Sequence, residues 1–260
     1  MSVMVRVALV VTILVPSPLL AASCPRDAVR VGTTCIDRYE ASVWRIPTGS
    51  TGLVKRIRKG TVTLADLAAA GATQLGAAKL EPCGGEYDPG FPSTGDWTEP
   101  VYAVSIPGVL PSTCVTWFQA EQACALSEKR LPTNQEWQRA AAGTPDPPFD
   151  DGATSCNLGS TFGPVPTGSR PACVSSWGVH DLVGNVAETV GDWDELATTC
   201  GSWMFGDTFC SGGTGNSNAI GTPIRGGYWD FGFPNSGIFH YNAAVPANAA
   251  YAHIGFRCAR

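Results

Sequence analysis

Ten cysteines are the feature that most limits what this chain can fold into. The same 260 residues include 30 Gly and 20 Pro, and only 15% of the residues are charged. This composition is typical of a loop-rich chain, which needs covalent links because it forms few long regular elements. An even number of cysteines in an exported chain indicates disulfides, which persist outside the cytoplasm. We therefore expect a domain held together by disulfides.

The N-terminal residues indicate export. Arg6 precedes an apolar run over residues 7–20, which two prolines interrupt, and the small residues 21–23 follow. This is the pattern of a secretory signal peptide, and the run is too short for a membrane span. We expect residues 1–23 to be a signal peptide and the protein to be periplasmic, at the cell surface or extracellular. The alternative is a lipoprotein signal, with Cys24 as a lipid anchor.

The charge pattern argues against nucleic acid as a partner. The formal net charge is -5, and Lys and Arg are scattered along the chain. The sequence contains no internal repeat, no low-complexity tract and no strong linker. We expect residues 24–260 to form one domain.

A few helices and many short strands are expected along this domain. Alternating apolar residues predict a hairpin over 24–36, and residues 101–106 have the composition of a strand. Helices are expected from Trp117 and after Thr133, where Glu136 three residues on completes a capping box. Beyond residue 145, Gly, Pro, Thr and Ser recur every few residues. The pattern is that of an α+β fold.

Four sequence blocks occur in the order typical of one known family. They are Lys129-Arg-Leu-Pro-Thr-x-x-Glu-Trp, Gly178-Val-His-Asp-Leu-Val-Gly-Asn-Val-Ala-Glu, Ile224-Arg-Gly-Gly-Tyr-Trp and Ile254-Gly-Phe-Arg-Cys-Ala. Together they resemble the formylglycine-generating enzyme (sulfatase-modifying factor) domain, over about residues 30–260. The resemblance implies a variant of the C-type lectin fold. It does not by itself imply the activity, because one fold hosts many functions.

The residues that this family's oxidase needs are missing from the matching stretch. That enzyme oxidises a substrate cysteine with a pair of cysteines a few residues after the Arg-Gly-Gly block, and the pair holds copper through soft sulfur ligands. Here residues 228–237 contain no cysteine. We therefore expect no copper, no formylglycine-generating activity and a protein that is not an enzyme. The family's iron-dependent sulfoxide synthases rely on a histidine cluster outside this domain, and this chain has three His.

The C-terminal segment 224–260 more closely resembles the variable proteins of diversity-generating retroelements. Its frame is Arg225-Gly-Gly-Tyr-Trp, then Gly237-Ile-Phe, then Ile254-Gly-Phe-Arg. In such proteins the positions between the framework residues are diversified and bind ligands. Aromatic residues among Asn, Ser and Gly suit a contact surface. The expected ligand-binding residues are Tyr228, Asp230, Phe231, Phe233, Asn235, His240, Tyr241, Tyr251 and His253.

The partner expected from this resemblance is a protein or cell-surface ligand of unknown identity. Three alternatives stay open. The chain could be a formylglycine-generating oxidase with displaced thiols, acting on a sulfatase-type substrate. It could be a purely structural envelope domain. Some of the aromatic residues, such as Phe231 and Phe233, could also be core residues under a loop.

The same resemblance implies a structural calcium site. The family binds calcium across the second block through an Asn or Asp, two backbone carbonyls and a Glu, and oxygen ligands of this kind suit calcium. The matching residues are Asp181, Gly184, Val186 and Glu188. The alternative is that the two acids are hydrogen-bonded structural residues in a tight turn.

Five disulfides are expected. The resemblance implies that Cys124, before the first block, bonds Cys258 in the last. Cys24 and Cys35 flank the turn of the expected hairpin, so they can pair locally. Proximity in sequence suggests Cys156 with Cys173 and Cys200 with Cys210, which leaves Cys83 with Cys114.

Overall fold

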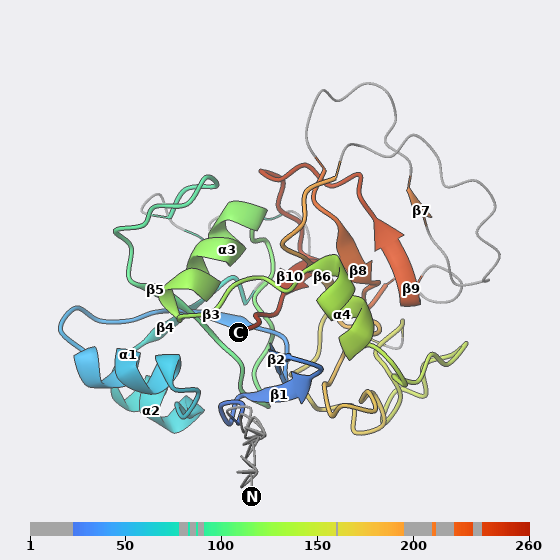
Figure 1. The fold of residues 1–260 in the computed structure, drawn as a ribbon, viewed down its shortest axis with the longest axis horizontal. Coiled ribbons are helices and arrows are strands. Elements are labelled where there is room, and N and C mark those ends of the chain that lie inside the picture. Colours follow the sequence, from blue (N-terminus) through green and yellow to red (C-terminus); the bar gives the residue numbers. More distant parts are fainter. Residues whose placement is uncertain are drawn as a thin grey trace, which may run out of the picture.

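The computed structural model describes residues 23–77, 83, 87, 91–159, 161–194, 210–211, 221–230 and 236–260. Over this part of the chain, four helices and ten short strands alternate with long loops (Figure 1). The expected α+β class is confirmed. In these same residues, no helix has both the length and the apolar character needed to cross a bilayer.

The N-terminal hairpin ties the two ends of the domain together. Strand β1 (Ala28–Val31) pairs antiparallel with β2 (Thr34–Asp37), as the alternating pattern predicted. Strand β2 also meets the chain end, because the backbone N–H of Cys35 donates to the carbonyl of Arg260 at 2.9 Å and the reverse bond is 2.8 Å. In Figure 1 the C-terminus accordingly lies beside this hairpin.

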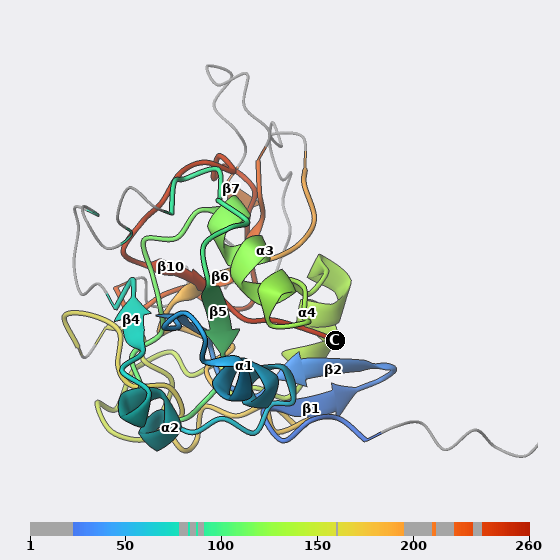
Figure 2. The same cartoon turned by 90° about the vertical axis from the view of Figure 1, so that its left-hand side faces the viewer.

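A three-stranded sheet with two helices forms one side of the molecule. The order of its strands is β4 (Thr73–Leu75), β3 (Ser42–Arg45), β5 (Val101–Val104). Helices α1 (Thr51–Arg58) and α2 (Leu64–Ala69) lie near this sheet (Figure 2). Ile57 and Leu67 are buried together with Trp44 and Tyr102. The amphipathic run that begins at Thr63 has the sequence pattern of a surface insertion, but the apolar side chains of this segment make it part of the core.

The two helices with clear sequence signals are confirmed. Helix α3 (Trp117–Leu126) begins after a capping box of Thr116 and Gln119, and α4 (Asn134–Ala140) after one of Thr133 and Glu136. The buried side of α3 carries Ala120 and Cys124, and that of α4 carries Trp137.

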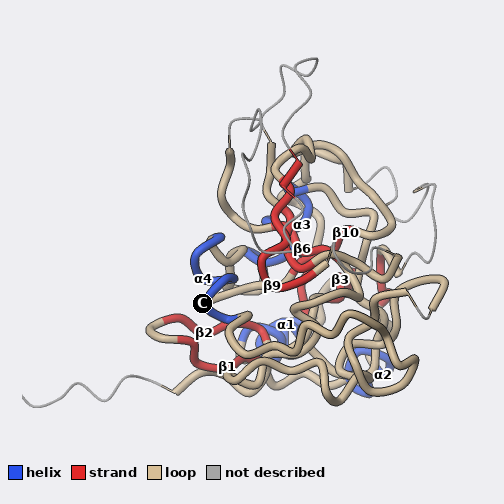
Figure 3. The backbone as a smooth tube through the Cα atoms, turned by 90° about the vertical axis from the view of Figure 1, so that its right-hand side faces the viewer, coloured by secondary structure: helices blue, strands red, loops and turns tan. Residues whose placement is uncertain are grey.

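A five-stranded sheet carries the C-terminal segment (Figure 3). In order, its strands are β10 (Ile254–Phe256), β6 (Ala187–Thr189), β8 (Ile224–Gly226), β9 (Gly237–Asn242) and β7 (Cys210–Ser211). The framework ends of segment 224–260 thus become β8 and β10, with β6 between them. This arrangement brings together residues about 30 positions apart, and part of the stretch between them forms β9, which pairs with β8 and β7.

Four disulfides join the described cysteines, and all four are pairs that the sequence suggested. They are Cys24–Cys35, Cys83–Cys114, Cys124–Cys258 and Cys156–Cys173. The sulfur of Cys24 is bonded to Cys35, so it cannot carry a lipid while that bond exists. The expected bond between Cys200 and Cys210 involves side chains outside the described residues. This number of disulfides indicates an oxidising compartment and agrees with export.

Candidate functional site

Three aromatic rings of the C-terminal segment lie against one another at the surface. The rings of Tyr228 and His253 are stacked with centroids 4.1 Å apart and planes at 26°. The ring centroid of Tyr251 lies 5.3 Å from that of His253. Tyr251 is 37% exposed, and the other two side chains are half-buried. We call Tyr228, Tyr251 and His253 the aromatic stack.

The backbone beneath the aromatic stack is fixed at several points. The carbonyl of His253 accepts from the N–H of Ala187 at 2.9 Å, and that of Tyr251 accepts from Cys114 at 3.0 Å and from Ile254 at 3.1 Å. Cys114 is itself held by its disulfide. The stack is therefore carried by an ordered backbone, which lowers the entropy lost when a partner binds.

Two residues expected at the contact surface are used for packing instead. His240 is only 1% exposed, so its assignment to the surface is wrong. The guanidinium carbon of Arg225 lies over two aromatic rings. It is 5.5 Å from the ring centroid of Tyr241 and 4.8 Å from that of Trp137. Burial lowers the pKa of Arg225 to about 10. These side chains stabilise β8 and β9 through cation–π contacts.

The other expected contact residues divide into two groups. Asp230 lies two residues after Tyr228 and is exposed, so its side chain is accessible to a partner. Phe231, Phe233 and Asn235 lie outside the described residues. Their assignment to the surface stays a prediction.

Buried His240 makes stability depend on pH. Burial, with a contribution from nearby Arg225, lowers the pKa of its imidazole to about 3 from 6.5. Below pH 6.5 the unfolded chain binds a proton that the folded chain does not, so stability falls as the pH decreases towards 3. At about pH 5 we expect wild type to have lost ~2 kcal/mol through this residue.

The measurement is urea unfolding of wild type and His240→Gln at about pH 7.5 and pH 5. Because other groups titrate equally in both proteins, the difference between their pH dependences isolates His240. The variant should lose less stability on acidification. Equal losses in the two proteins would show that His240 is protonated in the folded state.

An ion pair between β6 and the chain end lies at the centre of the domain. Both oxygens of the Glu188 carboxylate accept hydrogen bonds from Arg257, one of them at 2.6 Å. The indole N–H of Trp137 also donates to Glu188, at 2.7 Å. Arg257 donates further to the carbonyls of Asp37 at 3.0 Å and His180 at 2.8 Å. All three nitrogens of its guanidinium therefore donate to other segments.

The calcium site expected across residues 181–188 does not fit these contacts. The carboxylate of Glu188 is already engaged by Arg257, and one oxygen of Asp181 accepts the N–H of Gly168 at 2.7 Å. Among the described residues, no three His, Cys, Asp or Glu side chains are arranged to hold a metal ion. The contacts instead support the alternative of structural, hydrogen-bonded acids. Calcium binding remains a prediction that the geometry does not favour.

Sequence reasoning missed Glu40, whose buried carboxylate holds the turn formed by residues 181–188. Glu40 is fully buried; its carboxylate accepts from the N–H of Val186 at 3.1 Å and from the side-chain amide of Asn185. Burial, reinforced by the nearby carboxylates of Asp181 and Glu188, raises the pKa of Glu40 well above its usual value. The sequence offered little to reveal this role. Glu40 is a single acid two residues before β3, and its partner Asn185 lies 145 positions further along the chain.

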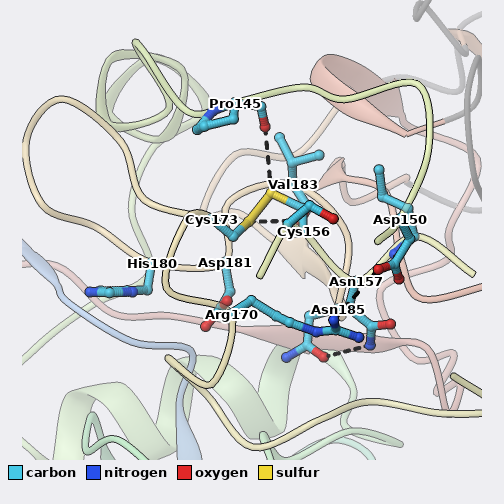
Figure 4. Close-up of a disulfide and its surroundings, with 12 residues drawn as sticks. Pro145, Asp150, Cys156, Asn157, Arg170, Cys173, His180, Asp181, Val183 and Asn185 are labelled. Atoms are coloured by element: carbon cyan, nitrogen blue, oxygen red, sulfur yellow. Dashed lines mark hydrogen bonds and ion pairs between the residues drawn. A yellow bond between two sulfur atoms is a disulfide. The ribbon is translucent and has the colours of Figure 1, made fainter. Parts of the chain in front are cut away.

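Next to this turn, a disulfide fixes the loop that precedes it (Figure 4). Cys156 and Cys173 are bonded, and the side-chain amide of the adjacent Asn157 donates to that of Asn185 at 3.1 Å. With this bond, eight of the ten cysteines have no thiol available. Thiolate chemistry could come only from Cys200 and Cys210, which lie outside the region where side chains are described.

Comparison with family models gives the class of the protein. Residues 93–260 match the model of the sulfatase-modifying factor enzyme 1-like domain, which is most of the chain. The chain belongs to this family, as its four sequence blocks indicated.

Among characterised proteins, the chain is similar to hercynine oxygenases. It is 29% identical over 143 residues to that of Mycolicibacterium smegmatis, covering 48% of this chain and 31% of the relative. It is 36% identical over 93 residues to that of Mycolicibacterium thermoresistibile, covering 32% and 21%. The chain thus spans about a third or less of the length of these relatives.

Solved structures agree with the expected lectin-like fold. The I1 variant of the Major Tropism Determinant matches with a TM-score of 0.50 and 20% identity, over 90% of this chain and 52% of that one. PvdO from Pseudomonas aeruginosa matches with a TM-score of 0.46 and 22% identity, over 92% and 89%. At this identity the first of these matches supports the fold and nothing further.

The comparisons correct one expectation. The missing cysteine pair led us to expect a protein that is not an enzyme. The relatives that match are named as oxygenases, which are enzymes, so that expectation is contradicted. The loss of one family member's catalytic cysteines is no ground for denying activity to this chain.

Proposed function

We propose that this chain is an exported recognition domain that binds a protein or cell-surface partner through the aromatic stack. The observation that carries the proposal is the contact of Tyr228, His253 and Tyr251 on a fixed backbone. Stacked, partly exposed aromatic rings on a rigid support are typical of the residues that contribute most to binding.

The charge around the aromatic stack supports the same proposal and limits the partner. Residues 171–256 contain seven acids but a single cationic residue, Arg225, which is buried. Two of these acids, Asp181 and Glu188, are buried, but Asp230 is exposed, and the segment has no exposed Lys or Arg. A neutral or cationic partner surface suits it better than an anionic one.

Site-specific crosslinking tests the proposal. A photoreactive phenylalanine analogue in place of Tyr251 should crosslink one discrete partner on cells of the producing organism, because Tyr251 is the most exposed ring of the aromatic stack. The same analogue at Trp177, which is 42% exposed but lies outside residues 224–260, should not. The crosslink at position 251 should disappear when Tyr228 and His253 are both replaced by Ala. Equal labelling from both positions, or none from 251, would contradict the proposal.

A second candidate is enzymatic, and the similarity to hercynine oxygenases favours it. Consumption of hercynine under air, followed by mass spectrometry, tests this candidate. A parallel assay with copper and a cysteine-containing peptide tests formylglycine formation.

A further inference from the structure

One segment of this acidic chain is locally rich in basic residues. Residues 41–65 contain five Lys or Arg and no Asp or Glu, although the whole chain has a net charge of -5. Four of the five are on α1 or at its C-terminal end: Lys55, Arg56, Arg58 and Lys59. A single short helix thus presents most of the positive charge on this side of the molecule.

Part of this charge is not neutralised by the surrounding acids. Arg56 pairs with Asp66 at 2.6 Å, and Arg58 pairs with Glu128 at 3.4 Å. Lys55 and Lys59 are exposed and make no ion pair with the described residues. Two lysines on one helix are therefore free to bind an external anion.

The start of the domain lies beside this helix and adds to the charge. Gly60, just after α1, has a positive φ and approaches so closely that an added Cβ would fall 2.9 Å from Pro25. Arg26 is exposed, and the guanidinium of Arg260 donates to the carbonyl of Arg58 at 2.9 Å. Figure 2 shows α1 next to the β1–β2 hairpin.

We call these six residues the basic face: Arg26, Lys55, Arg56, Arg58, Lys59 and Arg260. The acids that contact it are Asp27, Asp66 and Glu128, each of them paired. Six cations and three carboxylates leave a net charge of +3. In Figure 1 helix α1 lies at the opposite end of the molecule from β8 and β9. These two strands belong to residues 171–256, which contain a single Lys or Arg. Positive charge is therefore distributed unevenly between the two ends of the protein.

From this arrangement we propose that the basic face docks on an anionic phospholipid surface. Lysines on a helix, with no aromatic ring among the six residues, suit a layer of lipid headgroups better than nucleic acid bases, which proteins bind by stacking. This docking does not depend on the function proposed for the aromatic stack.

Vesicle binding of the full chain tests the inference. The protein is mixed with vesicles of phosphatidylcholine alone or with added phosphatidylglycerol, and the ratio of the two partition coefficients is measured by sedimentation. The ratio cancels any binding that does not depend on the anionic lipid, including binding through the apolar run 7–20. We expect phosphatidylglycerol to increase binding by at least about tenfold at low salt, since each basic residue near an anionic surface contributes about fivefold. High salt should abolish the increase.

Matched variants locate the effect. Lys55→Gln with Lys59→Gln should lower the ratio by about 25-fold, or to unity if the ratio is smaller than that. Arg139→Gln removes an exposed charge on α4 and should leave the ratio unchanged. Equal binding to both vesicles, or an unchanged ratio in the double variant, would overturn the inference. So would lysine-dependent binding to RNA or heparin without binding to vesicles, which would assign the face to another polyanion.

Discussion

Replacing Arg257 with Met should lower the free energy of unfolding by about 3–5 kcal/mol, because breaking a buried ion pair leaves an uncompensated charge. Arg257 has no exposed surface, and its guanidinium holds both oxygens of Glu188. Glu40 and Asp181 are close enough for the same guanidinium to act on them electrostatically. Its loss would therefore leave three acids together in the interior. Urea unfolding of purified protein measures the effect.

The control is Arg139→Met on α4, which removes an exposed arginine and should change stability by about 0.5 kcal/mol or less. Adding Glu188→Gln to Arg257→Met should recover part of the loss, because the unpaired carboxylate is then neutral. A loss below about 1 kcal/mol for Arg257→Met would mean that water reaches Glu188 in the folded protein.

Removing the Cys124–Cys258 disulfide should lower the free energy of unfolding by about as much as Arg257→Met does. The bond closes a loop with a sequence separation of 134 residues, and the loop-entropy relation gives about 5 kcal/mol for that length. Both cysteines are buried, and the bond attaches α3 to the residues after β10. We expect the double variant Cys124→Ala, Cys258→Ala to unfold at a much lower urea concentration than wild type.

The Cys156–Cys173 bond is a matched comparison within the same chain. It spans 17 residues, for which the same relation gives about 3 kcal/mol. The long-range variant should therefore lose more stability than the corresponding double Ala variant of this pair. The opposite order would show that native-state contacts, and not constraint of the unfolded chain, dominate the contribution of these disulfides.

Local signals in the sequence predicted local structure well. The hairpin of β1 and β2 and both capping boxes of α3 and α4 depend on residues that lie a few positions apart. Helix α1 was missed, because its N-cap Ser50 forms no side-chain capping bond and its first turn has no acid. The second helix nearby, α2, has a capping box at Thr63 and was recognised as a short amphipathic piece.

The candidate site was only partly predictable. Tyr251 and His253 were expected to contact a partner, and they meet Tyr228 in the aromatic stack. His240 lies in the same kind of sequence, an aromatic residue among small and polar ones. It is nevertheless buried, because β9 directs its side chain to the interior. A sequence of Asn, Ala, Tyr and His without an apolar period does not reveal which face of a strand is inside.

By itself, the sequence determined the family, the α+β class and the disulfide-linked character of this protein. These follow from short blocks, caps and cysteines, whose meaning depends mainly on the residue types and on near neighbours. Only the tertiary structure decided that Glu188 pairs with Arg257 and that the guanidinium of Arg225 lies against the rings of Trp137 and Tyr241. It also decided which rings form the aromatic stack and that the basic helix lies beside the start of the domain. The physical reason is that a side chain's charge state, exposure and partners depend on segments brought together from distant positions, such as the 69 residues that separate Glu188 from Arg257.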